Sequence, residues 1–301
     1  MGGGWLGGGW QGGGWQGGGW QGGGWQGGGW AGGGGDGLYT MRADRPLVAE
    51  DLNPDFNGTP KFPRGAWNTD LFALHFLPDF LTAKVSGKTW NQAITVNPNI
   101  PKVVMPGGVV SPGDDSIDDL RILAVTERPE AMGEILNQHQ DQQLCFMQLL
   151  MMTASSHPAT FFAMKLAARV GEVVMIRLKR QFNRPRPTQY YPALYPPVPV
   201  PGHAAYPAGH SLIAHLTARV LIEITTPTSG TSPYEKSLIK LADQIGLNRV
   251  IAGFHFRSDI TEGAAAGVLT HQFLTGIPAR NVTAPDFDYA SVVSAAKAEW
   301  K

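Results

Sequence analysis

The 301-residue chain has a single cysteine and no net charge. Cys145 cannot form a disulfide within the chain, so the sequence does not indicate an oxidising compartment. It lies in the apolar run LCFMQLLMM, where packing is favoured over a role as a nucleophile. Lys+Arg and Asp+Glu each number 24, and this balance argues against a nucleic-acid-binding protein, which would carry a basic excess. A local basic cluster around a small anion remains compatible with it.

The sequence also lacks long apolar runs. None reaches the ~20 residues that a membrane-spanning helix needs. The N-terminus has no charged start, short apolar stretch and cleavage site of a secretory signal. We therefore expect a soluble, cytoplasmic protein without a transmembrane segment, while export by another route stays open. Charged or polar side chains interrupt the most apolar regions at His157, Lys165, Arg169, Glu172 and Arg177.

Glycine and tryptophan dominate the start of the chain instead. The first thirty residues are six GGGW units, with a tryptophan at every fifth position up to Trp30. Glycine has the most backbone entropy to lose and no side chain to bury, so residues 1–36 are predicted to be a flexible low-complexity arm. Exposed tryptophans favour stacking on a partner, a membrane interface or other copies of the chain. We expect a homo-oligomer, with the arm as a candidate contact.

The rest of the chain divides into two parts by composition. Residues 37–114 are rich in Pro, Asn, Asp and Gly and are predicted to be a loop-rich region that packs on the core, with NTDLFALHFLPDFL as one helix. Residues 115–301 hold successive segments of helical pattern, one of which begins with Pro129 in the first turn. The sequence therefore predicts an all-α fold, a helical bundle that forms the catalytic domain.

The first chemically informative segment is KRQFNRPRP, at the end of a predicted helix. Lys179 and Arg186 lie seven residues apart, and Pro187 restricts the backbone after the arginine. Basic residues at a helix end commonly complement the helix dipole, so this segment alone is weak support for a site.

The second segment is PAGH, before a predicted apolar helix. The N-terminus of a helix presents free N–H groups to an oxyanion, and Gly209 permits close approach of the backbone. His210 follows at the helix start. An ordinary turn explains Pro and Gly equally well.

The third segment is NRVIAGFHFRSD. If it is helical, His255 and Asp259 lie four residues apart on one face, and the carboxylate holds the imidazole tautomer. The other ring nitrogen is then left as a nucleophile. A surface ion pair is the alternative, which the apolar neighbours of His255 disfavour.

Together these segments resemble the three-part signature of type 2 phosphatidic acid phosphatases, bacterial class A acid phosphatases and vanadium-dependent haloperoxidases. That signature reads K-x6-R-P, then P-S-G-H, then S-R-x5-H-x3-D. The resemblance extends over about residues 130 to 275 and departs at Ala208 and Asn248, where the family has serine. The lost hydroxyl at position 208 removes one hydrogen bond to the anion, worth ~1–3 kcal/mol.

The resemblance implies a role for each matching residue. His255 is implied as the nucleophile that becomes a phosphohistidine, or as the ligand of vanadate, and His210 as general acid and base, with Asp259 orienting His255. No metal site is expected apart from vanadate on His255. The residues implied to bind phosphate or vanadate are Lys179, Arg186, Ala208, Gly209 and Arg249. Ala208 and Gly209 are implied to bind it through their backbone N–H groups.

Two chemistries share such an anion site. A phosphatase needs no cofactor and acts on a small phosphorylated substrate, whereas a haloperoxidase needs vanadate and uses halide and peroxide. The short loop 188–206 resembles the acid phosphatases, while Arg257 after the histidine resembles haloperoxidases. We expect a PAP2-type phosphoric ester hydrolase, with the haloperoxidase as alternative. A self-assembling scaffold with a degenerate anion site is a second alternative, which Ala208 favours and the retained polar residues disfavour.

Other residues have less definite roles. His203 is interpreted as lying beside the site or gating access to it, and Arg184 and Arg180 as charges at the pocket rim or on a solvated face. Surface or packing roles are predicted for His75, His139, His157, His215 and His271.

Overall fold

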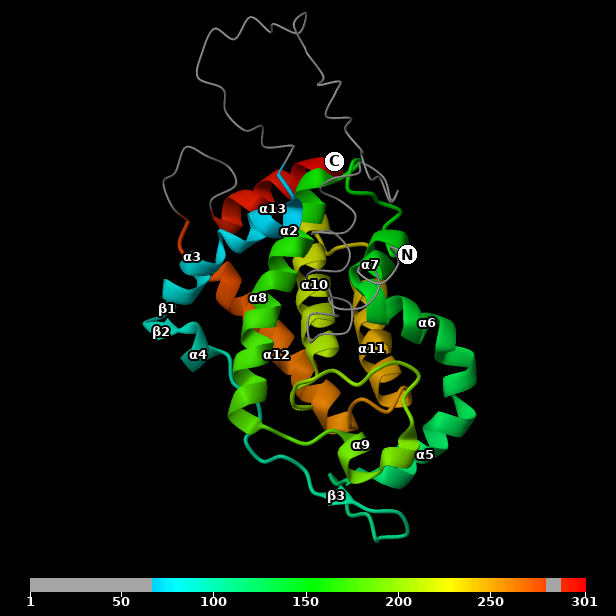
Figure 1. The fold of residues 1–301 in the computed structure, drawn as a ribbon. Helices are drawn as coiled ribbons and strands as arrows, with labels where there is room; N and C mark the ends of the chain where they lie inside the picture. Colours follow the sequence, from blue (N-terminus) through cyan, green and yellow to red (C-terminus); the bar gives the residue numbers. More distant parts are fainter. Residues whose placement is uncertain (1–66, 280–287) are drawn as a thin grey trace, which may run out of the picture.

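The computed structural model describes residues 67–279 and 288–301, and element labels follow Figure 1. The predicted GGGW arm and the first part of the predicted loop-rich region, up to residue 66, lie outside the described residues. The described chain is mostly helical, with four two-residue strands, which confirms the predicted all-α class. No helix in this described portion combines the length and the apolar composition that crossing a membrane requires.

The segment before the bundle contains short elements. The helix predicted over NTDLFALHFLPDFL is in fact two helices, α2 (Thr69–Leu74) and α3 (Leu77–Thr82), because Pro78 cannot continue the backbone hydrogen bonds of α2. Phe76 and Phe80 are buried in the main core. The remaining elements are β1 (Lys84–Val85) antiparallel to β2 (Lys88–Thr89), α4 (Trp90–Ala93), and β3 (Val103–Val104) parallel to β4 (Asp115–Ser116).

The bundle follows from residue 117. Helix α6 begins with Pro129 in its first turn, as the sequence predicts. Ser116 caps α5 with its side chain, and a proline also lies in the first turn of α8. The elements are α5 (Ile117–Thr126), α6 (Arg128–Asp141), α7 (Gln143–Leu149), α8 (Pro158–Phe182), α9 (Pro187–Tyr190), η2 (Pro192–Leu194), α10 (Gly209–Thr225), α11 (Glu235–Ile251), α12 (Arg257–Thr275), α13 (Tyr289–Lys297) and η3 (Ala298–Trp300).

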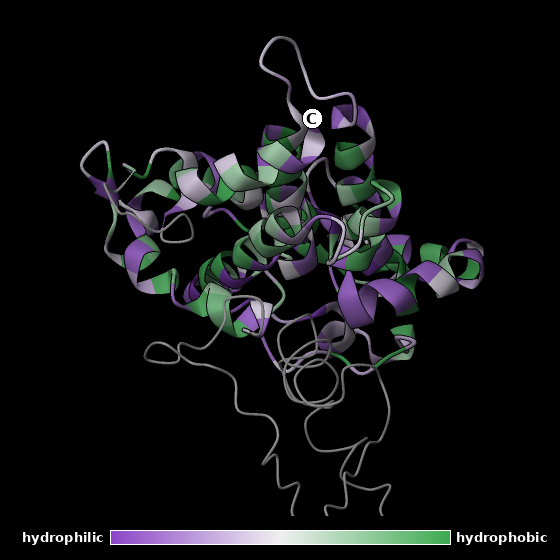
Figure 2. Ribbon diagram, turned by 90° about the horizontal axis from the view of Figure 1, so that it is seen from above, coloured by the Kyte–Doolittle hydropathy of each residue, from purple (hydrophilic) through white to green (hydrophobic). Residues whose placement is uncertain are grey.

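Helix α10 occupies the centre of the bundle. It packs against α8, α11 and α12, and it lies between them in Figure 1. Leu212, Leu216 and Val220 on α10 are fully buried, as the apolar sequence of this helix leads one to expect. The outer helices carry both hydrophobic and hydrophilic stripes (Figure 2), so they cover the core with one side only.

Two glycines set the distance between α10 and α12. A Cβ atom on Gly263 would lie 2.5 Å from the Ala208 carbonyl oxygen, and one on Gly267 would lie 2.5 Å from the Leu212 oxygen. Only glycine, which has no Cβ, allows the backbone of α10 to lie this close to α12. The start of α10 is therefore held directly against the first turns of α12.

The C-terminal segment closes the opposite end of α8. Glu299 accepts hydrogen bonds from the N–H groups of Ala159 and Thr160, at 2.7 and 2.9 Å, and from the Thr160 hydroxyl. These N–H groups have no acceptor within the helix, and the carboxylate also complements the helix dipole. The end of the chain thereby fixes the long helix that carries Lys179 at its other end.

Candidate active site

The three predicted segments meet at one end of the bundle. Lys179 lies in the last turn of α8, which ends at Asn183 in a left-handed conformation with φ of 47°. Gly209 begins α10 opposite this turn. A Cβ on Gly209 would lie 3.8 Å from Lys179 Cε and only 2.1 Å from Met175 Sδ. The absence of a side chain at this position is what allows the two helix ends to approach.

The third segment folds differently from the prediction. Helix α11 ends at Ile251 and α12 begins at Arg257, so His255 lies in the turn between them and not on a helix. Asp259 is in the first turn of α12, where its carboxylate accepts the Phe256 N–H at 2.9 Å. This capping interaction brings Asp259 Oδ2 to 3.2 Å from His255 Nδ1. The pair is therefore formed, although the predicted shared helix face is wrong.

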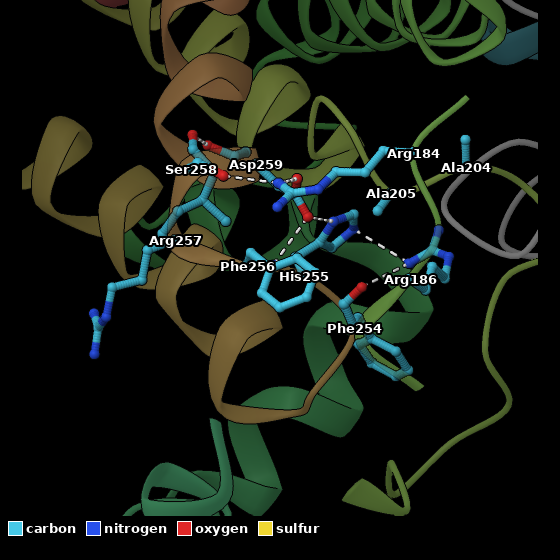
Figure 3. Close-up of polar contacts among 12 residues, drawn as sticks. Arg184, Arg186, Ala204, Ala205, Phe254, His255, Phe256, Arg257, Ser258 and Asp259 are labelled. Atoms are coloured by element: carbon cyan, nitrogen blue, oxygen red, sulfur yellow. Dashed lines mark hydrogen bonds and ion pairs between the residues drawn. The ribbon is translucent and has the colours of Figure 1, made fainter. Parts of the chain in front are cut away.

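The partners of His255 determine its tautomer. Arg186 Nη1 lies 3.4 Å from His255 Nε2, and a guanidinium can only donate, so Nε2 carries the lone pair. Nδ1 then carries the proton and donates it to Asp259. Figure 3 shows the imidazole between the Asp259 carboxylate and the Arg186 guanidinium. Burial, followed by the charges of Arg186 and Lys179, lowers the pKa of His255 well below its ordinary value. The imidazole therefore directs the lone pair of Nε2 toward Arg186.

Arg184 is a buried partner of this pair. Its interpretation as a rim or solvated charge is wrong, because it is only 3% exposed. Its Nη1 lies 2.6 Å from Asp259 Oδ1, and its Nη2 lies 2.7 Å from Asp115 Oδ2. Burial raises the pKa of Asp259, and Arg184 is the largest influence that opposes this rise. The position of Arg184, two residues before Arg186, is a sequence signal that places it near the site. Its partner Asp115 lies far away in the chain, so the sequence does not indicate this ion pair.

Lys179 and Arg186 are held by backbone carbonyl groups. Lys179 Nζ donates to the oxygens of Ala204 and Ala205, both at 2.7 Å. Arg186 donates to the carbonyl oxygens of His203 at 2.8 Å and of Phe254 at 3.1 Å. Burial lowers the pKa of Arg186 to about 10 and that of Lys179 well below its ordinary value, since no carboxylate pairs with either side chain in the described chain.

Arg249 is the most completely buried of these cations, at 1% exposure. Its Nη2 donates to the Ile135 carbonyl oxygen at 3.0 Å, whereas Nε and Nη1 have no hydrogen-bond partner. Burial lowers its pKa to about 10, which still leaves it protonated at neutral pH. Asn248, at the position of the family's serine, donates to Glu134 at 2.8 Å and to Gln138 at 3.0 Å. Both partners belong to α6, which thus supports the segment that carries Arg249.

The PAGH segment is placed as predicted, with one correction. The Ala208 N–H donates to the Asp259 carbonyl oxygen at 2.8 Å, so it is not available to an anion. The N–H of Gly209, in the first turn of α10, has no acceptor within its helix. His210 Nε2 is buried without a hydrogen-bond partner. Burial and then the charge of Arg249 lower the pKa of His210 well below its ordinary value.

The positions of His203 and Arg257 differ with respect to the site. His203 Nδ1 lies 3.0 Å from Arg186 Nη2, so His203 is at the site, and burial together with Lys179 and Arg186 lowers its pKa to about 4. Arg257 points away from His255 (Figure 3) and pairs with Asp119 at 2.7 Å on the surface. Arg257 therefore does not contribute to the site.

The charges of the site do not balance. Four buried cations face two buried carboxylates, Asp259 and Asp115, and both carboxylates already contact Arg184. The uncompensated charge and the free donors of Arg249 fit a doubly charged oxyanion. No group of three His, Cys, Asp or Glu side chains among residues 67–279 and 288–301 is placed to hold a metal ion. The four cations are Lys179, Arg184, Arg186 and Arg249.

Comparison with known proteins finds a family similar to the part of the chain that carries the site. Residues 155–282 match the model of the PAP2 superfamily, and they include all three segments. A solved structure with a similar chain is the first transmembrane PAP2 type phosphatidylglycerolphosphate phosphatase from Bacillus subtilis, at 20% identity and a TM-score of 0.39 over 53% of this chain and 82% of that chain. No curated protein matches the sequence. Residues 155–282, which carry the three segments, are thus similar to the PAP2 superfamily.

Proposed function

We propose that the protein is a phosphatase that hydrolyses phosphate esters through a phosphohistidine on His255. The observation that carries the proposal is the set of buried polar atoms without hydrogen-bond partners. Arg249 Nε and Nη1 and His210 Nε2 lack partners in a site with an excess of buried positive charge. Buried polar groups without partners are rare, and a bound phosphate group would satisfy them. The similarity of residues 155–282 to the PAP2 superfamily supports phosphatase-type chemistry in general.

His255 is the proposed nucleophile. Its Nδ1 proton is held by Asp259, so Nε2 presents its lone pair to phosphorus. Attack forms the N–P bond while the P–O bond to the leaving group breaks. Positive charge that develops on the ring is stabilised by the Asp259 carboxylate, which is itself kept in place by the Phe256 N–H.

The buried cations are proposed to hold the transferring phosphoryl group. After burial, the charges of Arg186, Lys179 and Arg249 each lower the pKa of His255, and this supports a common role at that histidine. Charge on the equatorial oxygens is stabilised by such donors in a site that excludes water. The dianion would also raise the pKa of Lys179, which the neighbouring Arg186 now depresses together with burial.

His210 is proposed as the general acid and base. In the free protein its pKa is low, because burial and Arg249 disfavour the imidazolium. A bound phosphate dianion supplies the negative charge that favours protonation. His210 then protonates the leaving oxygen and later accepts a proton from the water that hydrolyses the phosphohistidine.

Haloperoxidase chemistry is the alternative from the sequence. Vanadate has the same tetrahedral shape as phosphate and fits the same residues, with His255 as its ligand, where it would activate peroxide for halide oxidation. The sequence feature that favoured this alternative was Arg257, which lies at the surface with Asp119. No contact in the described chain therefore favours it over hydrolysis.

The test compares both reactions in one preparation. We expect hydrolysis of p-nitrophenyl phosphate without added metal, inhibition by orthovanadate, and no bromination of a phenolic dye with vanadate, bromide and peroxide. His255→Ala is the matched inactive variant. Bromination without phosphate hydrolysis would reject the phosphatase in favour of the haloperoxidase, and loss of neither activity in His255→Ala would reject the site.

A further inference from the structure

The pair of His255 and Asp259 is joined by hydrogen bonds to residues that have no role of their own in the proposed reaction. Arg184 contacts the carboxylate oxygen of Asp259 that His255 does not use, with Nη1 at 2.6 Å from Asp259 Oδ1 (Figure 3). The same side chain reaches Asp115 Oδ2 at 2.7 Å through Nη2. Ser258 is a third member, since its hydroxyl accepts from Arg184 at 2.8 Å and donates to Asp115.

We propose that Arg184 is a positioning residue, which acts through Asp259 to hold His255 in its reactive tautomer and orientation. The proposal rests on the proposed phosphatase function. One carboxylate oxygen of Asp259 is used by His255 Nδ1 and the Phe256 N–H, and the other is used by Arg184. With both oxygens engaged, the carboxylate has one orientation in which all three contacts are made.

Asp115 fixes Arg184 in turn. It lies in β4, outside the residues that match the family, and it is 5% exposed. Its other oxygen accepts the Ser258 N–H at 3.3 Å, at the start of α12. The Arg184 guanidinium also lies 4.4 Å over the ring of Phe256. The segment before the bundle thereby contributes to the geometry of His255 although it does not contact the substrate.

Charge adds to the effect of geometry. Asp259 is completely buried, and a buried carboxylate tends to become protonated. A protonated Asp259 would no longer hold His255 Nδ1–H, so the nucleophile would lose its fixed tautomer. Arg184 is the cation in direct contact with it. The other titratable groups that face Asp259 are His255, Lys179 of α8, Arg186 after α8 and Tyr206 before α10, while Asp115 acts from β4 through Arg184.

The test is a double-mutant cycle on kcat and on its pH profile. Arg184→Gln should lower kcat at least tenfold with little change in KM, and it should move the acid limb of kcat to higher pH. In an Asp259→Asn background the same substitution should have no further effect, because its route to His255 is already absent. Arg180→Gln is the matched control, because Arg180 is an exposed arginine in the last turn of α8, four residues before Arg184, and we expect wild-type kinetics from it.

Equal loss on both backgrounds, or an unchanged pH profile, would overturn the proposal and leave Arg184 as a residue of structure only. If Arg184→Gln does not fold, Asp115→Asn and Arg184→Lys are measured in the same cycle, with a smaller shift expected in the same direction and the same result required. The tautomer of His255, read by NMR of protein with ¹⁵N-labelled histidine, is independent of turnover. We expect an Nδ1–H form in wild type that is lost in Arg184→Gln; an unchanged tautomer contradicts the proposal even if the protein proves not to be a phosphatase.

Discussion

Substitution of Gly263 by alanine tests the link between helix packing and the site. The new Cβ would lie 2.5 Å from the Ala208 carbonyl oxygen and 3.0 Å from Ser211 Cβ, both at the start of α10. Overpacking of this kind costs about 1–3 kcal/mol, and the better helix propensity of alanine returns ~0.5–1 kcal/mol. We expect a net loss of about 1–2 kcal/mol in the free energy of unfolding. Because α12 carries Asp259 and α10 carries His210, separation of the two helices should also lower kcat.

Gly133→Ala is the matched control. Gly133 also lies within a helix, α6, but a Cβ there has nothing within 4 Å. It should gain ~0.5–1 kcal/mol from helix propensity without any change in kinetics. Both variants are compared with wild type by urea denaturation and by p-nitrophenyl phosphate hydrolysis. If Gly263→Ala is as stable and as active as Gly133→Ala, the close approach of α10 and α12 described above is wrong.

Three further predictions concern the anion, the partly buried His203 and the arm. Arg249→Gln should weaken phosphate or vanadate binding at least ~10-fold in isothermal titration, since a charged hydrogen bond is worth ~1.5–3 kcal/mol; wild-type affinity would remove Arg249 from the anion site. His203 should titrate near pH 4 in NMR of the free protein, because burial and the charges of Lys179 and Arg186 disfavour its protonation. The unfolded chain takes up this proton near pH ~6.5. His203 therefore lowers the free energy of unfolding as the pH falls from there toward 4. Over that range, His203→Gln should lose less stability than the wild-type protein. Deletion of residues 1–36 should reduce the assembly size in light scattering and leave kcat per site unchanged, because glycine-separated tryptophans cannot bury one another within so short a segment; an unchanged mass would contradict the role in assembly.

The resemblance to the three-part signature implied which side chains meet, and the helix ends of the fold give a physical reason for it. Lys179 and Gly209 belong to the ends of strongly apolar helices, whose packing is determined by their buried faces. Helix ends of this kind are visible as prolines, glycines and the end of an apolar pattern. The all-α class followed from the same patterns, and the matching segments in their order led to the family.

The errors came from local backbone geometry and from contacts distant in sequence. A histidine and an aspartate four residues apart can meet on one helix face, or when the histidine lies in the turn before the helix. The spacing of His255 and Asp259 alone could not distinguish these two arrangements. The contact of Arg184 with Asp115 joins residues 69 positions apart, and no periodicity relates them. Likewise, the acceptor of the Ala208 N–H is the carbonyl oxygen of Asp259 in α12. The sequence could not indicate this hydrogen bond, because it depends on how α12 packs on α10.

The most direct test of the central claim is to trap the covalent intermediate. The protein is mixed with a ³²P-labelled phosphate ester, quenched within one turnover in alkali, in which a histidine N–P bond survives, and digested for mass spectrometry. We predict label on the peptide that contains His255, loss of the label on acid treatment, and no label in His255→Ala. Turnover of the ester without label on His255, or label on another residue, would contradict the assignment of His255 as the nucleophile.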